Sequence, residues 1–172
     1  MTRQELQRIT PYARGGNIDI YTPLLNKFMG HYGINTQARK AAFLATILHE
    51  SGSLTYTEEI ASGLAYEGRQ DLGNTKAGDG KRYKGRGLIQ ITGRYNYSVA
   101  SIAMGIDLLK NPELLSEPEN ATWVSCWWWQ SKGLNELADR GDFRRITRIV
   151  NGGYNGWTDR LNFYNKAKEV LK

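Results

Sequence analysis

One segment of the chain is apolar on almost every side of the helix that it would form. It begins at a candidate N-cap, Asn35 or Thr36, and runs to about Glu50. Its apolar residues fall on all helical faces: Ala38, Ala41, Ala42, Phe43, Leu44, Ala45, Ile47 and Leu48. A helix without a polar face must be buried in the middle of a domain. We therefore expect the other elements to pack around residues 36–50.

Helical periodicity recurs in four further segments. The first is an amphipathic helix over about 21–32, with Pro23 tolerated in its first turn. The other three are expected at 120–130, 142–150 and 158–171. The last of these would have Thr158 or Asp159 as its N-cap. Between them, residues 63–87 are glycine-rich and polar, which predicts a long loop or short ribbon of the kind that often lines a site.

Length and composition limit the class of protein that this chain can form. With 172 residues, 40% hydrophobic and 23% charged, the chain fits one domain over residues 1–172 with a real core. The formal charge of +6 is spread along the chain and suggests attraction to polyanions, which fits an anionic cell envelope as well as it fits nucleic acid. No apolar run of about 18 residues and no leader pattern stands out, so we expect neither a membrane span nor a signal peptide. The single cysteine, Cys126, is expected to be an inert core thiol among tryptophans.

Acidic residues follow the apolar segment. Glu50 would stand at the end of a buried helix, where burial and the negative end of the helix dipole favour the protonated carboxyl of a proton donor. Gly52 ends the helix and lets the chain fold back, so that a second acid, Glu59, can return across a cleft. Its neighbour Glu58 is an equally acidic candidate. Two carboxyl groups on opposite sides of one sugar linkage are what acid/base cleavage of a glycosidic bond requires.

The segment Leu88–Thr92 alternates between apolar and polar residues. If it is extended, Ile89 and Ile91 face the core and Leu88, Gln90 and Thr92 share the other face. A threonine hydroxyl in that position can hold a water against a base carboxylate. A glutamine amide can hold a sugar hydroxyl or an N-acetyl group.

Cofactor motifs are missing. Gln90 stands where a dinucleotide fingerprint needs its third glycine, and Gly80-Lys81 lacks the Ser or Thr of a P-loop. Ser53 stands where a zincin motif, begun by the His-Glu pair, needs its second histidine. We therefore expect no nucleotide, no metal and no organic cofactor.

Several blocks, in order along the chain, resemble those of glycoside hydrolase family 19: His49-Glu50-Ser51-Gly52, Tyr83 to Thr92 with Tyr95-Asn96-Tyr97, Trp127-Trp128-Trp129, Val150-Asn151-Gly152-Gly153, and Asp159-Arg160 through Phe163-Tyr164. Within that family the chain looks most like the short endolysins of phages and prophages of Gram-negative bacteria. The resemblance implies a mainly α, lysozyme-like, two-lobed helical fold with a small β or loop element lining the cleft. It also implies an inverting mechanism, for which the two carboxyl groups would stand roughly 6.5 to 9.5 Å apart.

Carried over by position, the resemblance makes Glu50 the general acid, Glu59 the general base and Thr92 the residue that positions water. It assigns substrate contacts to five further residues, with Arg160 also supporting the carboxylates: Gln90, Tyr95, Asn96, Asn151 and Arg160. One departure is that Tyr154-Asn155 stands where chitinases carry an acid. The charged partners of Arg160 must therefore differ from those in chitinases. The tryptophan helix is expected to be core.

The expected function is that of a monomeric, peptidoglycan-degrading endolysin that cleaves between N-acetylated amino sugars. It would wait in the host cytoplasm until it is released to the cell wall. Three alternatives remain open: a chitinase, a lytic transglycosylase, and a non-catalytic glycan- or nucleic-acid-binding module. Nucleic acid is the least expected partner, because binding a polyanion does not call for a carboxyl group at a buried helix end.

Overall fold

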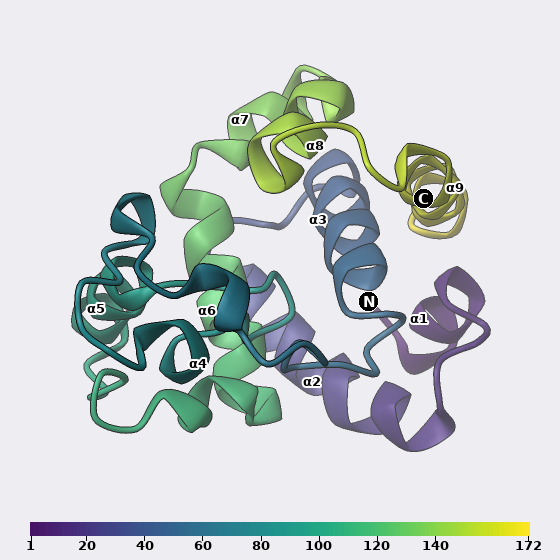
Figure 1. Ribbon diagram of the computed structural model, residues 1–172. Coiled ribbons are helices and arrows are strands. Elements are labelled where there is room, and N and C mark those ends of the chain that lie inside the picture. Colours follow the sequence, from purple (N-terminus) through teal and green to yellow (C-terminus); the bar gives the residue numbers. More distant parts are fainter.

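A computed structural model describes all residues from 1 to 172, and the expectation of a mainly helical fold is confirmed. Figure 1 shows nine α-helices: α1 (Arg3–Ile9), α2 (Gly15–His31), α3 (Gln37–Glu50), α4 (Asp79–Arg82), α5 (Arg94–Met104), α6 (Pro118–Ser131), α7 (Leu134–Asp139), α8 (Phe143–Asn151) and α9 (Trp157–Val170). Three 3-10 turns are η1 (Leu64–Tyr66), η2 (Gln70–Leu72) and η3 (Pro112–Ser116). Strand pairing is limited to two isolated bridges, both of which involve Arg86. None of the helices is long and apolar enough to cross a membrane.

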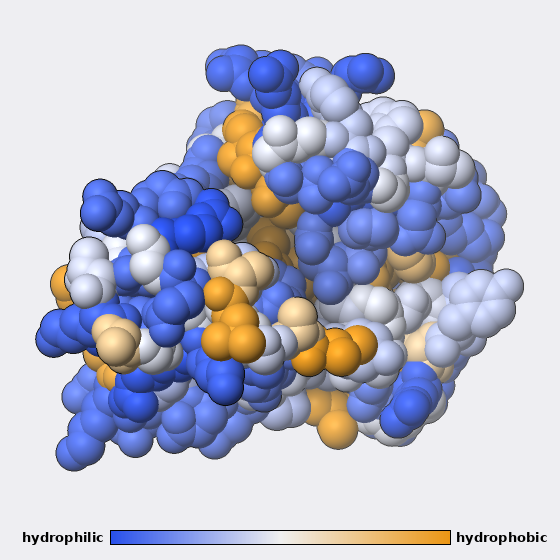
Figure 2. Space-filling model, viewed as in Figure 1, coloured by the Kyte–Doolittle hydropathy of each residue, from blue (hydrophilic) through white to orange (hydrophobic).

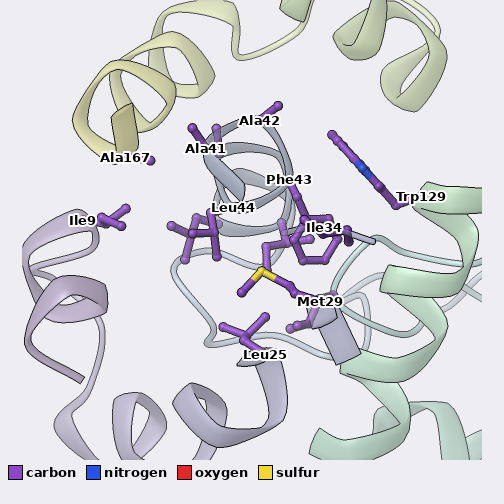
Figure 3. Close-up of a cluster of buried hydrophobic side chains, with 14 of the residues drawn as sticks. Ile9, Leu25, Met29, Ile34, Ala41, Ala42, Phe43, Leu44, Trp129 and Ala167 are labelled. Atoms are coloured by element: carbon purple, nitrogen blue, oxygen red, sulfur yellow. The ribbon is translucent and has the colours of Figure 1, made fainter. Parts of the chain in front are cut away.

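The helix α3 lies at the centre of the larger core, as its sequence predicts. Thr36 is its N-cap and accepts a hydrogen bond from the backbone N–H of Arg39 at 3.2 Å. All eight residues from Ala41 to Leu48 are buried. Figure 3 shows side chains of α1, α2, α6 and α9 directed at this helix. The helix reaches the surface at both ends, from Gln37 to Lys40 and again at His49 and Glu50.

Several helix starts differ from those expected, most of all that of α2. α2 begins at Gly15, so Pro23 lies inside the helix and not in its first turn. The sequence does not reveal this earlier start, because Ile18 is the only buried residue between 15 and 20 and one residue shows no periodicity. α9 begins at Trp157, and its N-cap is Gly156 with a left-handed backbone, not Thr158 or Asp159. Helices α1, α5 and α7 were not expected either.

A second, smaller core forms the other lobe. It gathers buried side chains from the long loop, α5 and their surroundings: Tyr83, Ile89, Ile91, Tyr97, Ala100, Met104, Leu108, Leu115 and Val124. The helix α6 belongs to both cores, because Val124 packs in the smaller and Cys126 and Trp129 in the larger. Cys126 is fully buried, as expected, and burial raises the pKa of its thiol. Figure 2 shows a hollow between the lobe of α4 and α5 and the part that carries α8.

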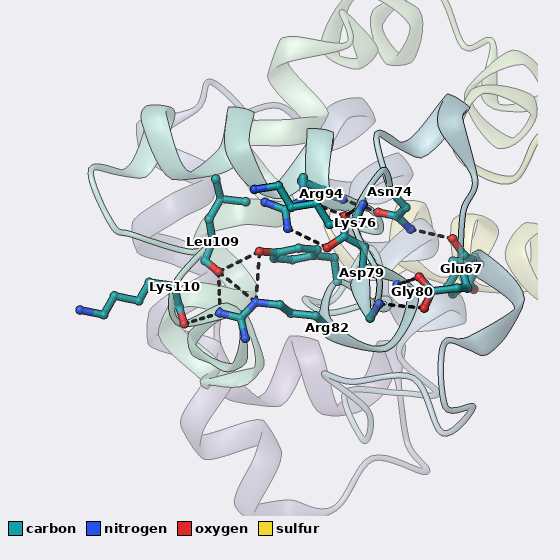
Figure 4. Close-up of polar contacts among 12 residues, drawn as sticks. Glu67, Asn74, Lys76, Asp79, Gly80, Arg82, Arg94, Leu109 and Lys110 are labelled. Carbon is teal, nitrogen blue, oxygen red and sulfur yellow. Dashed lines mark hydrogen bonds and ion pairs between the residues drawn. The ribbon is translucent and has the colours of Figure 1, made fainter.

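A buried ion pair holds the long loop of the smaller lobe together (Figure 4). Both carboxylate oxygens of Asp79 accept from Arg94, at 2.7 and 2.8 Å, and the backbone N–H of Lys76 adds a third bond at 3.0 Å. Asn74 accepts from the backbone N–H of Arg94 at 2.8 Å and donates to the carbonyl of Tyr66 at 2.8 Å. The expected loop is therefore ordered by polar side chains around η1, η2 and α4, without strands.

Removing this ion pair should destabilise the protein. The hydrogen bonds from Arg94 hold the pKa of Asp79 below its usual range, although burial opposes them. We expect Asp79→Asn to cost about 2 to 4 kcal/mol at pH 7, because it leaves the Arg94 charge without its partner. The difference in the free energy of unfolding between the two proteins should be full above about pH 4. It should shrink as the pH falls through the lowered pKa of Asp79. Urea unfolding of both proteins across pH 3 to 7 checks this, and a pH-independent difference would contradict it.

Candidate active site

The end of α3 is tied to the start of α9 by two neighbouring pairs. The Glu50 carboxylate accepts a hydrogen bond through Oε1 from Nη2 of Arg160, which is almost completely buried. Beside it, Nδ1 of His49 lies 2.7 Å from a carboxylate oxygen of Asp159. Oε2 of Glu50 has no hydrogen-bond partner in the protein and remains available to a ligand.

The hydrogen-bond partners of Arg160 are not all acidic side chains, as Tyr154-Asn155 in the sequence predicts. Its Nε donates to the backbone carbonyl of Asn155 at 2.9 Å, so a peptide oxygen takes the place of a carboxylate. Its Nη1 is buried without a partner. The side chain of Asn151 accepts from the N–H of Asn155 at 3.1 Å and thereby shapes the turn that holds Arg160. In this structure Asn151 therefore supports Arg160 through the turn, and its effect on the site is indirect.

Glycine is required in that same turn. Gly156 has a φ of 72°, a left-handed conformation that glycine adopts without steric cost. A Cβ atom on it would lie only 2.1 Å from Cε1 of His49. The close approach of the α8–α9 turn to α3 therefore depends on the missing side chain.

A left-handed turn follows Glu50 and returns the chain across the end of α3. Gly52, Ser53 and Leu54 have φ values of 56°, 58° and 65°. For the latter two this conformation is unfavourable by about 1 to 2 kcal/mol each. The buried hydroxyl of Ser51 stabilises the turn, because it donates to the carbonyl of Ile47 at 2.6 Å and accepts from the N–H of Leu54 at 2.9 Å. Non-glycine residues in such conformations gather at functional sites.

The returning chain presents Glu59 to neutral donors. One carboxylate oxygen accepts from the backbone N–H of Gly85 at 2.8 Å, and the other accepts from the hydroxyl of Tyr66 at 3.0 Å. The backbone N–H of Glu59 in turn donates to the carbonyl of Gly85 at 2.9 Å. The carboxylate is held in place without a cation against it.

Glu58 has a different environment. One of its oxygens lies 3.0 Å from Nζ of Lys84 and 3.3 Å from Nη2 of Arg86. Partial burial raises the pKa of Glu58, but the hydrogen bond from Lys84 and the two positive charges outweigh it, so that the net pKa is lowered. The structure therefore separates two acids that the sequence left equivalent.

The segment 88–92 is a tight turn and not the expected extended strand. Arg86 and Ile91 exchange both backbone hydrogen bonds, at 2.7 and 3.0 Å, and Gln90 between them has a φ of 63°. Ile89 and Ile91 are buried as expected, but Leu88 is also completely buried and does not share the polar face. The period-two argument was wrong here because residues inside a turn do not alternate between two faces.

Gln90 and Thr92 nevertheless meet at Gly85. A Cβ atom on Gly85 would lie 2.7 Å from Oε1 of Gln90 and 3.3 Å from Oγ1 of Thr92. The Thr92 hydroxyl donates its own proton to the carbonyl of Gln90 at 3.1 Å. Both side chains thus lie against the peptide whose N–H holds Glu59.

One pocket lies across the end of α3 and takes in Gln90, whereas Thr92 is not among its lining residues. Its volume is about 330 Å³, and its lining residues come from three segments: Glu50, Tyr56, Glu58, Glu59, Ile60, Ala61 and Gln90. Both candidate carboxyl groups therefore face the same space. No group of three or more His, Cys, Asp or Glu side chains gathers in a way that could hold a metal ion.

Tyr95 and Asn96 line a different pocket, of about 220 Å³, on α5 and α6. The side chain of Asn96 donates to the carbonyl of Thr92 at 2.7 Å. Trp127 and Trp128 also line this second pocket, and both are partly buried and pack against the hydrophobic cores. The expectation of a core helix is therefore confirmed for Trp129, which is fully buried, and holds in part for Trp127 and Trp128.

Nothing in the sequence marks Tyr66, although its hydroxyl holds Glu59. Tyr66 lies in the short turn η1, where no periodicity indicates its direction. The pairing of His49 with Asp159 could not be predicted for a different reason, because the partners come from separate helices. A contact between two helices leaves no pattern in the sequence of either one.

Comparisons with known proteins agree with this arrangement. A family model described as chitinase class I, of glycosyl hydrolase family 19, matches residues 25–138. An endochitinase of Arabidopsis thaliana is 37% identical over 128 residues, which cover 73% of this chain and 43% of that protein. A glycosyl hydrolase family 19 domain-containing protein of Haemophilus influenzae is 34% identical over 106 residues, covering 62% of this chain and 51% of that protein.

The chain thus spans about half the length of the curated relatives it matches. Chitinase C of Streptomyces griseus has the same fold, with a TM-score of 0.80 over 99% of this chain and 91% of that one, at 24% identity. The family match covers more than half of the chain and includes the segment from α3 to Thr92 that builds the pocket. The chain belongs to glycoside hydrolase family 19.

Proposed function

We propose that the protein hydrolyses glycosidic bonds between N-acetylated amino sugars of peptidoglycan, by an inverting acid/base mechanism, as a phage-type endolysin. The observation that carries this proposal is the pocket that Glu50 and Glu59 share, with each carboxyl group held by different partners. Acid/base cleavage of a glycosidic bond needs two carboxyl groups in different environments.

Glu50 is the general acid in this mechanism. Arg160 holds one carboxyl oxygen, which leaves the other free to carry the proton toward the leaving oxygen of the sugar. After the transfer, the buried guanidinium of Arg160 stabilises the carboxylate that remains.

Glu59 is the general base, and Glu58 is not. The partners of Glu59 are a peptide N–H and a phenol hydroxyl, which fix its direction without neutralising its charge. The carboxylate of Glu58 already faces two cations and has a lowered pKa, so it is the weaker base.

Thr92 positions the water. Its own proton is directed to the carbonyl of Gln90, so its oxygen is left as an acceptor. A water whose two protons point to Thr92 and Glu59 presents a lone pair to the sugar carbon. This arrangement favours hydrolysis over the lytic transglycosylase reaction, which needs no activated water.

Chitin is the second candidate substrate, because several of the relatives are named endochitinases. The formal charge of +6 favours the anionic cell wall over an uncharged polymer. In a phage-type role the protein would act as a monomer, held in the host cytoplasm until a separate pore-forming protein releases it.

The choice of substrate can be measured directly. Purified peptidoglycan and chitin oligomers should be digested under the same conditions and the products analysed by mass spectrometry. We expect faster release from peptidoglycan, with reducing ends that carry the mass of one added water. Products with an anhydro end would identify a transglycosylase, and cleavage of chitin alone would identify a chitinase.

Three glutamine substitutions separate the acidic residues. Glu50→Gln and Glu59→Gln should each lower kcat by about a hundredfold or more, because they remove the acid and the base. Glu58→Gln should stay within about tenfold of the native enzyme, since it removes only a partner of Lys84 and Arg86. The rates of the three variants are measured on one substrate, and circular dichroism shows that each variant is folded. A Glu58→Gln enzyme as inactive as Glu59→Gln would overturn the choice of base.

The role of Thr92 predicts both a rate and a stereochemical outcome. Thr92→Val removes the hydroxyl and keeps the shape, so activity should fall about tenfold or more while the free energy of unfolding changes by about 1 kcal/mol. The first product of the native enzyme should have the inverted anomeric configuration, observed by NMR before mutarotation. A retained anomer would indicate a covalent intermediate and exclude this mechanism.

A further inference from the structure

Three arginines on α8 line a pocket outside the proposed active site. Arg144, Arg145 and Arg148 surround a space of about 570 Å³ together with Asp142, Ile149 and Tyr154. All three arginines are exposed, and their side chains form no ion pair or hydrogen bond. Other arginines of this chain are paired, such as Arg39 with Asp139 and Arg69 with Asp71.

Two of these arginines occupy unfavourable positions on the helix that carries them. Arg144 and Arg145 lie in the first turn of α8, where the positive end of the helix dipole repels cations, whereas Arg148 lies in the last turn, where a cation is favoured. Arg144 and Arg148 are four residues apart, a spacing at which like charges repel each other. Asp142 is the one acid in the pocket, and its carboxylate caps the helix by accepting from the backbone N–H of Arg145 at 3.1 Å. Local costs of this kind are typical of functional sites.

Aromatic rings orient one of the guanidinium groups. The Arg144 guanidinium lies 4.6 Å from the ring centre of Tyr154 and 5.7 Å from that of Trp157. Stacking of this kind holds the planar group in place while its N–H donors stay free. Arginine presents these donors in a fork that matches the two oxygens of a carboxylate.

The pocket is connected to the candidate active site through one short turn. Tyr154 lines the pocket, and the carbonyl of the next residue, Asn155, holds Arg160 against Glu50. In Figures 1 and 2, α8 stands at the edge of the hollow between the lobes. A negatively charged branch on a glycan bound at Glu50 can therefore extend toward the arginines.

We propose that Arg144, Arg145 and Arg148 bind carboxylates of the peptide stems that branch from peptidoglycan. The inference rests on the proposed function and makes it more specific. Stem peptides carry several carboxylates on each repeat of the glycan, whereas chitin carries none. The pocket would then select the substrate through its anionic branch, separately from the carboxyl groups that cleave the sugar bond.

The test combines two triple variants with two substrates. The first variant replaces Arg144, Arg145 and Arg148 by glutamine. The matched control loses the same charge at exposed, unpaired positions away from α8: Arg14→Gln, Lys81→Gln and Lys110→Gln. The substrates are intact peptidoglycan and the same glycan strands after an amidase has removed the stems. Because the α8 arginines repel one another, the first variant should unfold at the native temperature or slightly above it.

We expect the α8 variant to lose about tenfold or more in kcat/KM on intact peptidoglycan and to match the native enzyme on stripped strands. The control should match the native enzyme on both. Equal losses by the two variants would mean that only the net charge matters, and would overturn the proposal. An equal loss of activity by the α8 variant on both substrates would overturn it as well. If the native enzyme cleaves neither form, the proposed function itself fails. Cleavage of both forms with no difference between the variants refutes only the role of α8.

Discussion

The structure depends on the burial of a helix that has no polar face. All residues of α3 from Ala41 to Leu48 are removed from water, and helices from both ends of the chain must cover them. Burying this much apolar surface is the main favourable term available to the fold. The helix emerges at its ends, and at the C-terminal one His49 and Glu50 appear at a fixed place on the surface of a rigid core.

The two lobes hold the two proposed catalytic groups by different means. Glu50 belongs to the larger core and is fixed by a buried arginine of α9. Glu59 belongs to the loop of the smaller lobe, where a chain of polar contacts runs from the Asp79–Arg94 pair through Asn74 to Tyr66. Because α6 packs in both cores, it fixes how far apart the lobes, and therefore the two carboxyl groups, stand.

The distribution of charge also changes when the chain is folded. In the sequence the lysines and arginines are dispersed, and no segment stands out as basic. In the structure, ion pairs neutralise several of them, among them Arg3, Arg39, Arg94 and Arg160. The arginines of α8 keep their charge and converge on one pocket. Part of the unpaired positive charge therefore lies together in one pocket on α8.

The sequence by itself determined the central helix, its N-cap at Asn35 or Thr36, its end near Glu50 and the burial of Cys126, because periodicity and capping are local properties. The family resemblance added the acids and Thr92. Only the tertiary structure gave Glu58 and Glu59 different environments, since these depend on Lys84, Arg86 and Tyr66. It also decided the turn at Gln90 and the pocket that Trp127 and Trp128 line. These features depend on contacts between segments far apart in the chain, which no local pattern records.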